Sequence, residues 1–197
     1  MGARGVILPP SFYDRPADQV APGLLGRILV SERAGVRVAG RIVEAEAYLS
    51  EDDPSCHASV GRTQRNDPMF GPPGRAYVYF TYGMHWLLNA VCAAEGVPEA
   101  ALIRALEPLE GLEVMAERRG RNRPRDLCSG PAKLAQALGI DADDNRRDLT
   151  AGETLWIEEG APVSGEAMAA GPRIGVGGDL RPLRYAVPGS QWLSARI

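Results

Sequence analysis

Two carboxylates and a phenol occupy every second position of the segment Glu44-Ala45-Glu46-Ala47-Tyr48. In a β-strand, side chains alternate between the two faces, so Glu44, Glu46 and Tyr48 share one face. That face is either an exposed polar surface or the floor of a cleft, because buried carboxylates need partners. In a cleft, a carboxylate beside an aromatic wall could serve as a general base. The segment alone leaves both interpretations open.

A second segment is dense in aromatic side chains and contains the sequence Tyr82-Gly83-Met84. Strand, tight turn and strand is the simplest interpretation, because Gly83 can adopt a positive φ at the tip. Tyr77 and Tyr79 then point to the same side of the hairpin. An aromatic residue and a methionine at the tip indicate a contact surface, since exposed apolar groups tend to mark one. One use for such a tip is as a wedge between DNA base pairs.

Two basic residues occur where they could hold an anion. Arg104 lies in the otherwise apolar segment 102–106 and needs a partner if it is buried. That partner could be a structural glutamate, a phosphate or a catalytic water. Lys133 follows a predicted helix start at Ser129, where free backbone N–H groups suit a phosphate. An ordinary capped helix with a surface lysine would show the same pattern.

The composition limits the class of protein. A length of 197 residues, with 45% hydrophobic and 24% charged residues, predicts one globular domain over residues 1–197. No apolar run could span a bilayer and residues 1–10 lack the features of a signal peptide, so we expect a cytoplasmic protein, associated with the nucleoid when bound to DNA. Three scattered cysteines and two histidines favour neither a disulfide framework nor a metal centre. We expect no metal and no cofactor.

The net charge of −3 does not by itself indicate a nucleic-acid-binding protein. Recognition depends on where the charges lie, however, and arginines concentrate in residues 62–75 and 118–125. The second stretch is a loop of Gly, Asn, Pro and Arg. It is suited to reaching phosphates, and equally typical of a solvated surface loop.

The elements that must position these residues are mainly strands, with a few helices. Strands are predicted over residues 27–30, 36–48, 77–91 (as a hairpin), 100–106, 155–157 and 183–187. Helices are predicted over 20–25, 108–119 and 128–138, the last with Ser129 as its N-cap. The long polar connection 50–74 is expected either to carry function or to be disordered. The pattern indicates one mixed α/β domain.

Five segments of the sequence resemble a known family: 41–48, 77–84, 104–110, 127–134 and 173–177. Through them the sequence is similar to the alkyladenine DNA glycosylase family, also called the mammalian-type DNA-3-methyladenine glycosylases. This family has short bacterial members. The resemblance runs from about Phe12 to Trp192, and matches of this length in one order are far more specific than a short motif. It implies a single α+β domain on a curved, mainly antiparallel sheet, with a protruding β-hairpin that intercalates into DNA.

The activity implied by the resemblance is that of a monofunctional DNA glycosylase of base excision repair. Such an enzyme flips alkylated purines (3-methyladenine, 7-methylguanine) and deaminated purines (hypoxanthine) out of duplex DNA. It then hydrolyses the N-glycosidic bond and leaves an abasic site. The implied partner is double-stranded DNA containing a damaged purine, approached from the minor groove by a monomer.

The resemblance also assigns roles to residues of the pocket. Glu46 matches the general base that activates water. Arg104 matches an arginine near the catalytic water and the phosphate of the target nucleotide. Asn89 matches a residue that obstructs the exocyclic amino group of normal guanine. The flipped base is implied to be held by Tyr48, His57, Tyr79 and Asn89.

DNA contacts are implied for Tyr82, Met84, Arg62, Arg65 and Lys133. Among these, Tyr82 takes the place of the extruded nucleotide. The family commonly has a further arginine and a proline where this chain has Val60 and Gln64. This departure predicts DNA contacts that are thinned rather than lost.

Two other functions compete with the glycosylase interpretation. A non-enzymatic damaged-DNA-binding protein would keep the wedge and the arginines but would not need Glu46. A glycosidase acting on free nucleosides or sugars could use Glu44 and Glu46 as a carboxylate pair. It would have no use for the tip at Tyr82, and its activity would not depend on duplex DNA.

Overall fold

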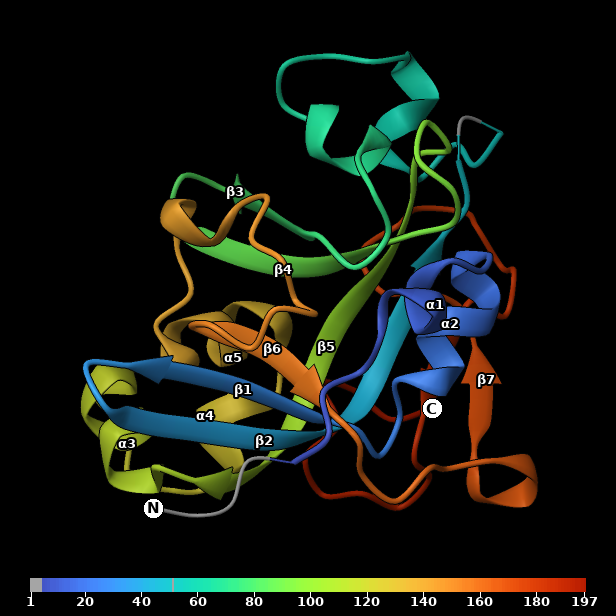
Figure 1. The fold of residues 1–197 in the computed structure, drawn as a ribbon. Coiled ribbons are helices and arrows are strands. Elements are labelled where there is room, and N and C mark those ends of the chain that lie inside the picture. Colours follow the sequence, from blue (N-terminus) through green and yellow to red (C-terminus); the bar gives the residue numbers. More distant parts are fainter. Residues whose placement is uncertain (1–4, 51) are drawn as a thin grey trace.

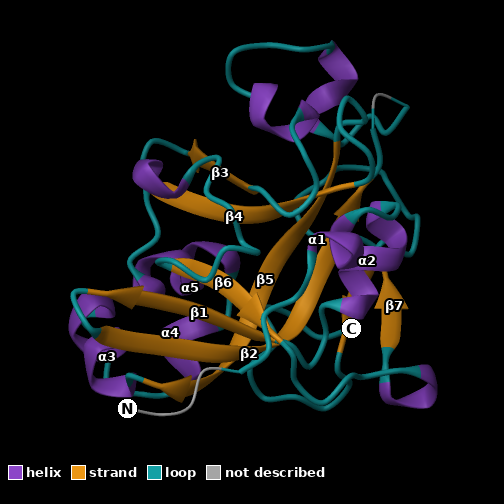
Figure 2. Ribbon diagram, viewed as in Figure 1, coloured by secondary structure: helices purple, strands orange, loops and turns teal. Residues whose placement is uncertain are grey.

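An open sheet of eight strands forms the centre of the molecule, and short helices lie around it (Figure 1, Figure 2). The computed structural model describes residues 5–50 and 52–197, so the first four residues of the N-terminal segment considered above lie outside it. The strand order is β3-β4-β5-β2-β1-β6, with β8 pairing with β2 and β7, and all these pairings are antiparallel. The predicted α+β fold on a mainly antiparallel sheet is confirmed.

The element boundaries are as follows. The strands are β1 (Ile28–Arg33), β2 (Val36–Tyr48), β3 (Ala76–Thr81), β4 (His85–Cys92), β5 (Glu99–Glu110), β6 (Leu155–Glu158), β7 (Ala169–Gly171) and β8 (Arg184–Ala186). The α-helices are α1 (Pro10–Tyr13), α2 (Ala17–Gly23), α3 (Leu112–Arg119), α4 (Arg125–Cys128) and α5 (Pro131–Leu138). The 3₁₀ helices are η1 (His57–Val60), η2 (Asp67–Phe70), η3 (Ala142–Asp144) and η4 (Gly165–Ala167).

Strand β2 has three pairing partners. Its first half pairs with β1, and its second half lies between β5 and β8, with Glu46 opposite both Leu102 and Arg184. The register shifts between Ile42 and Glu44, and such bulges bend a strand and increase its twist. The bent second half of β2 therefore lies where segments from distant parts of the chain converge.

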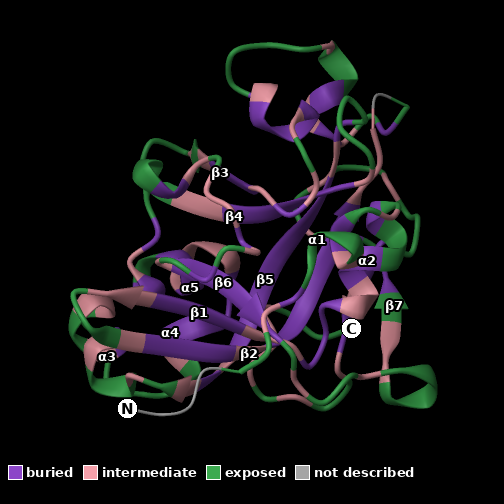
Figure 3. Ribbon diagram, viewed as in Figure 1, coloured by how far each residue is buried: buried purple, intermediate pink, exposed green. Residues whose placement is uncertain are grey.

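The helices cover the sheet at two places and leave its loops exposed. Helix α2 packs on β2 and β5, whereas α5 packs on β4 and β5 (Figure 1). Buried residues follow the strands through the centre, and exposed residues concentrate at the turns and loops (Figure 3). In the part of the chain that the structure describes, no helix has the length and apolar character needed to cross a membrane.

The connection 52–74 has a defined structure built around Asn66. The buried amide of Asn66 donates to the carbonyl oxygens of His57 and Gly61, both at 2.8 Å. The connection also packs on the sheet through a cluster of buried side chains. The cluster comprises Cys56, Ala58, Met69, Phe70, Tyr77, Val91 and Ala100. These contacts hold His57 in a fixed place beside β3.

Two predicted helices have wrong boundaries. The helix predicted over 108–119 begins only at Leu112, because β5 continues to Glu110. Pro108 is tolerated in β5 next to a register shift, where a missing N–H disrupts little. The helix predicted over 128–138 begins only at Pro131, as α5, because α4 ends at Cys128 and Gly130 between them has a φ of +153°. Gly130 rather than Ser129 is therefore the N-cap of α5.

The remaining differences are smaller. The helix predicted over 20–25 is α2, which begins at Ala17 directly after a proline. The strands predicted over 27–30 and 183–187 are Ile28–Arg33 and Arg184–Ala186. Strand β7 was not predicted, because its sequence Ala-Ala-Gly has neither β-branched residues nor alternation.

Candidate active site

A pocket of about 390 Å³ lies between β3, β4, β5, the connection 52–74 and residues 174–176. This volume is within the range of small-molecule sites, roughly 300–1,000 Å³. Aromatic rings form much of its wall, and a few polar groups point into it. The predicted residues that line it are Tyr48, His57, Tyr79, Tyr82, Asn89 and Arg104. The fold thus brings these side chains from four segments to one cavity.

The carboxylate of Glu46 lies beneath this pocket and is fully buried. Its Oε1 accepts the backbone N–H of Ile174 at 2.7 Å, and its Oε2 accepts Tyr48 Oη at 3.0 Å and Arg104 Nη1 at 3.2 Å. All three donor residues line the pocket. Burial raises the pKa of Glu46 above its ordinary value, although Arg104, Ile174 and Tyr48 lower it in part. A carboxylate with a raised pKa next to a pocket is suited to accept a proton.

The second carboxylate of β2, Glu44, has partners on both of its oxygens. Its Oε1 accepts Arg104 Nε at 3.2 Å, and the charge of Arg184 lies 3.0 Å away. The backbone N–H and the hydroxyl of Ser194 both donate to Glu44 at 2.7 Å. Arg104 therefore bridges Glu44 and Glu46. The interpretation of this strand face as an exposed polar surface is wrong, and Arg104 does have a structural glutamate as a partner.

Three aromatic side chains form one wall of the pocket. The rings of His57 and Tyr79 meet edge to face with centroids 4.6 Å apart, and Tyr77 lies 5.3 Å from Tyr79. Burial lowers the pKa of the His57 imidazole, and the charge of Arg65 lowers it further, so the ring is neutral at pH 7. Asn89 Nδ2 donates to the carbonyl of Tyr77 at 3.0 Å, which fixes the orientation of the amide in the pocket.

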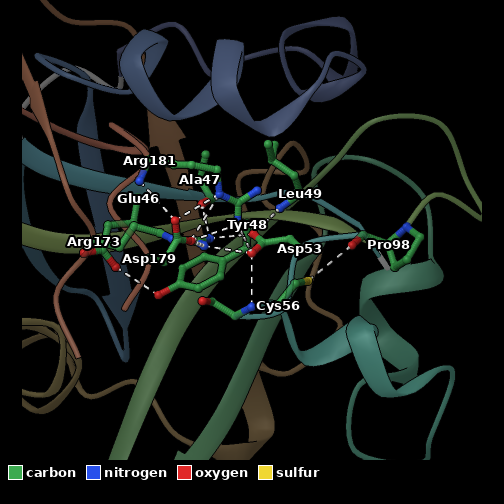
Figure 4. A network of polar contacts seen from close by, with 11 residues as sticks. Glu46, Ala47, Tyr48, Leu49, Asp53, Cys56, Pro98, Arg173, Asp179 and Arg181 are labelled. Carbon is green, nitrogen blue, oxygen red and sulfur yellow. Dashed lines mark hydrogen bonds and ion pairs between the residues drawn. The ribbon is translucent and has the colours of Figure 1, made fainter. Parts of the chain in front are cut away.

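A buried ion-pair network packs on the ring of Tyr48, whose hydroxyl bonds Glu46 (Figure 4). The guanidinium carbon of Arg173 lies 4.5 Å from the centroid of the Tyr48 ring. Arg173 binds Asp53 through Nη1 at 2.6 Å and through Nη2 at 2.7 Å, and it also binds Asp179. Burial acts to raise the pKa of Asp53, but hydrogen bonds from Arg173 and two backbone amides lower it to about 2. The network therefore holds its charge in neutral solution.

Sequence reasoning assigned no role to Arg173, Asp53 or Asp179. Arg173 and Asp53 are 120 positions apart, and no local pattern links residues at that separation. The only signal was that residue 173 begins a segment that resembles the family. The backbone N–H of Ile174, which bonds Glu46, was missed for the same reason.

The tip of the β3–β4 hairpin is exposed, as the sequence predicted. Tyr82 is 85% exposed and Met84 67% exposed. Tyr82 and Gly83 have φ values of +51° and +67°, and Met84 N donates to the carbonyl of Thr81 at 3.2 Å. Two consecutive residues with positive φ form a type I′ turn, which glycine adopts without strain and tyrosine does not. Strained residues of this kind cluster at functional sites.

The other residues predicted to contact DNA differ in the exposure of their side chains and in the partners that they bind. Arg62 is largely exposed and pairs with Asp67 at 2.6 Å. Lys133 Nζ donates to Ser129 Oγ at 3.2 Å, beside a hollow that the exposed His85 also lines. The residues predicted to contact DNA at the hairpin, Tyr82 and Met84, and the basic residues Arg62 and Lys133 are all exposed or half-exposed.

Arg65 lies against the pocket wall, which the sequence did not indicate. Its guanidinium carbon is 5.5 Å from the centroid of the Tyr79 ring, and Nη2 donates to the carbonyl of Phe80 at 3.2 Å.

Among the residues that the structure describes, no group of three or more His, Cys, Asp or Glu side chains could hold a metal ion.

Residues 11–191 match the methylpurine-DNA glycosylase family. A protein of Burkholderia lata, named "Putative 3-methyladenine DNA glycosylase", is 50% identical over 197 residues, which cover 98% of this chain and 93% of that protein. Proteins with the same name from Carboxydothermus hydrogenoformans and Methanocella arvoryzae are each 48% identical, covering 97% and 96% of this chain and 100% and 96% of their own lengths. The resemblance inferred from the motifs is confirmed, and the chain belongs to the methylpurine-DNA glycosylase family, a family of hydrolytic DNA N-glycosylases.

Proposed function

We propose that this protein excises 3-methyladenine, 7-methylguanine and hypoxanthine from duplex DNA with water that Glu46 deprotonates. The observation that carries the proposal is the position of Glu46 beneath an aromatic pocket, with a raised pKa and three donors that orient it. A carboxylate oxygen can accept two hydrogen bonds. Oε1 receives only one from the described residues, that from Ile174, so it retains one acceptor position for a water molecule.

The chemistry follows from the charge of the leaving base. In an alkylated purine the base is cationic, so the C1′–N bond breaks with its electron pair leaving on a neutral base. Positive charge develops on the sugar, and the negative charge of Glu46 stabilises it. The oxygen of water then bonds to C1′, and its proton passes to Glu46. Hypoxanthine is neutral and must gain a proton as it leaves.

The product follows from the groups that line the pocket. No lysine is among the described residues that line it, so no amine is present there to form a Schiff base with the sugar. We therefore expect a monofunctional enzyme that leaves an abasic site in an intact strand.

Recognition of the base begins with its extrusion from the duplex. Extrusion has a free-energy cost of a few kcal/mol, and this cost is lowest at a damaged base pair. Tyr82 enters the duplex from the minor groove and fills the gap, a role that its exposure at the hairpin tip supports. The faces of Tyr48, His57 and Tyr79 favour an electron-poor purine. Asn89 obstructs the amino group of normal guanine. Arg62, Arg65 and Lys133 contact the DNA around the site, and the protein acts as a monomer.

A single-turnover assay tests this function. The substrate is a labelled duplex with one 7-methylguanine or one hypoxanthine, and an undamaged duplex is the control. We expect release of the damaged base, with strand breaks appearing only after hot alkali. Tight binding without base release would identify a damaged-DNA-binding protein instead. Release from free nucleosides at the same rate would identify a nucleoside glycosidase.

The rate of base release from 7-methylguanine is expected to fall at acidic pH. Glu46 accepts a proton only as the carboxylate, so protonation removes activity. Because the pKa of Glu46 is raised by burial, the loss begins at a higher pH than for an ordinary glutamate. A pH profile of the single-turnover rate measures this limb. A rate that stays constant well below the ordinary range of glutamate would contradict Glu46 as the base.

A further inference from the structure

The two ring nitrogens of His57 have different surroundings. Nδ1 lies 2.8 Å from the phenol oxygen of Tyr77. No group in the described part of the chain bonds Nε2, and His57 lines the pocket. A neutral imidazole carries its proton on only one of these nitrogens. The position of that proton decides whether His57 offers the pocket a donor or an acceptor.

The direction of the hydrogen bond between His57 and Tyr77 depends on Arg65. The guanidinium of Arg65 lies over the neighbouring ring of Tyr79 and is anchored to the carbonyl of Phe80. Burial and Tyr79 act to raise the pKa of the Tyr77 phenol, against the nearby positive charge of Arg65. That charge favours the orientation in which the lone pairs of the phenol oxygen face Arg65 and the phenol proton points away from it.

Only one acceptor is available to the phenol proton of Tyr77. In the described structure the Tyr77 hydroxyl has a single hydrogen-bond partner, namely Nδ1 of His57. A proton on Nδ1 would leave the phenol proton of the buried Tyr77 without an acceptor and would point it into the same region as the Arg65 cation. An unmade hydrogen bond at such a place is unfavourable. Tyr79 is the other tyrosine that contacts the His57 ring, and these two rings meet edge to face.

We infer that Arg65 and Tyr77 hold His57 in the neutral tautomer with its proton on Nε2, so that the pocket presents an N–H donor to an acceptor atom of the extruded purine. The acceptor is a ring nitrogen or a carbonyl oxygen of the base. Tyr77 and Arg65 are positioning residues, since they act on the base through His57. The donor role rests on the proposed function, whereas the tautomer is a property of the free protein.

Nuclear magnetic resonance of ¹⁵N-histidine-labelled protein tests the tautomer. The chain has two histidines, and the second, His85, is exposed and is assigned with the variant His85→Gln. We expect His57 to show an unprotonated Nδ1 and a protonated Nε2 in the free protein at pH 7. A protonated Nδ1, or rapid exchange between both tautomers, would overturn the inference.

Variants of the two positioning residues separate their action from a merely structural one. Tyr77→Phe removes the donor to Nδ1, and we expect loss of the single tautomer while the ring packing remains. Arg65→Gln removes the cation and is expected to have the same effect in part. Arg65→Lys keeps the charge and is expected to retain the wild-type tautomer. An unchanged spectrum in Tyr77→Phe would contradict the role of the phenol.

The donor role is tested by adding DNA to the labelled variant Glu46→Gln, in which the base stays attached. One duplex contains hypoxanthine and the other an abasic analogue at the same position. We expect the Nε2–H resonance to shift with the hypoxanthine duplex only. Identical spectra with both duplexes would overturn the donor role. The tautomer is read without DNA, so failure of the proposed function and failure of this inference are distinguishable.

Discussion

Replacement of Glu46 by glutamine is expected to reduce the single-turnover rate of base release by about 10²–10⁴-fold, the usual contribution of a general base. Glutamine has nearly the same size and retains one acceptor oxygen, so it can keep the hydrogen bond from Ile174 or the one from Arg104 but not both. It cannot take the proton from water. Binding of the lesion duplex should change little, and a fluorescence titration alongside the rate measurement checks this.

Two other glutamates provide matched controls for Glu46→Gln. Glu107→Gln changes a partly exposed carboxylate on β5 that pairs with Arg41, and we expect the wild-type rate. Glu44→Gln changes the neighbouring buried carboxylate, whose partners include Ser194 and Arg184. Its main effect should be on stability. Equal loss of rate in folded Glu44→Gln and Glu46→Gln proteins would indicate a carboxylate-pair mechanism.

Replacement of Arg173 by methionine is expected to destabilise the protein by about 3–5 kcal/mol, the usual effect of removing one partner of a buried ion pair. The side chain of Arg173 is fully buried, and so is that of Asp53. The substitution removes the two hydrogen bonds that Arg173 donates to Asp53. The melting temperature should fall by roughly 10 °C, given 2–4 °C per kcal/mol for a chain of this size. Thermal unfolding followed by circular dichroism measures the change.

Arg181 supplies the control for Arg173, because it binds the same two carboxylates from the surface. Its side chain is 41% exposed, and it lies 2.5 Å from Asp53 and 2.8 Å from Asp179. Exposed ion pairs contribute only about 0–1 kcal/mol, so Arg181→Met should lower the melting temperature by a few degrees at most. Equal decreases in melting temperature for the two substitutions would show that burial does not determine how much Arg173 contributes to stability.

The residues that could be predicted from sequence are those whose signal is local. Alternation placed Glu44, Glu46 and Tyr48 on one face, and a glycine between apolar side chains marked the hairpin tip at Tyr82. These signals depend on the period of the strand and the conformational freedom of glycine. The helix over 108–119 was partly wrong because pairing with β2 overrides the local preference around Pro108.

The partners of the buried carboxylates on β2 could not be predicted, because tertiary structure alone brings them together. Ser194 and Arg184 satisfy Glu44, and nothing in their own neighbourhoods marks them as glutamate partners. The resemblance to the family implied that Arg65 contacts DNA. Its position over Tyr79 follows from the fold of the 52–74 connection around Asn66.

The partners of Glu44 on β2 also determine how much of the chain must be made before this buried carboxylate has all of its hydrogen bonds. The buried carboxylate of Glu44 needs Arg104, which is 60 residues further along the chain, and Ser194, which is 150 residues further. The ribosome adds roughly 5–20 residues per second, so Glu44 waits many seconds for its last partner. A nascent chain that ends before Ser194 has the charged partners Arg104 and Arg184 but lacks the two hydrogen bonds that Ser194 donates. The surroundings of this buried carboxylate are therefore complete only after residue 194 has been made.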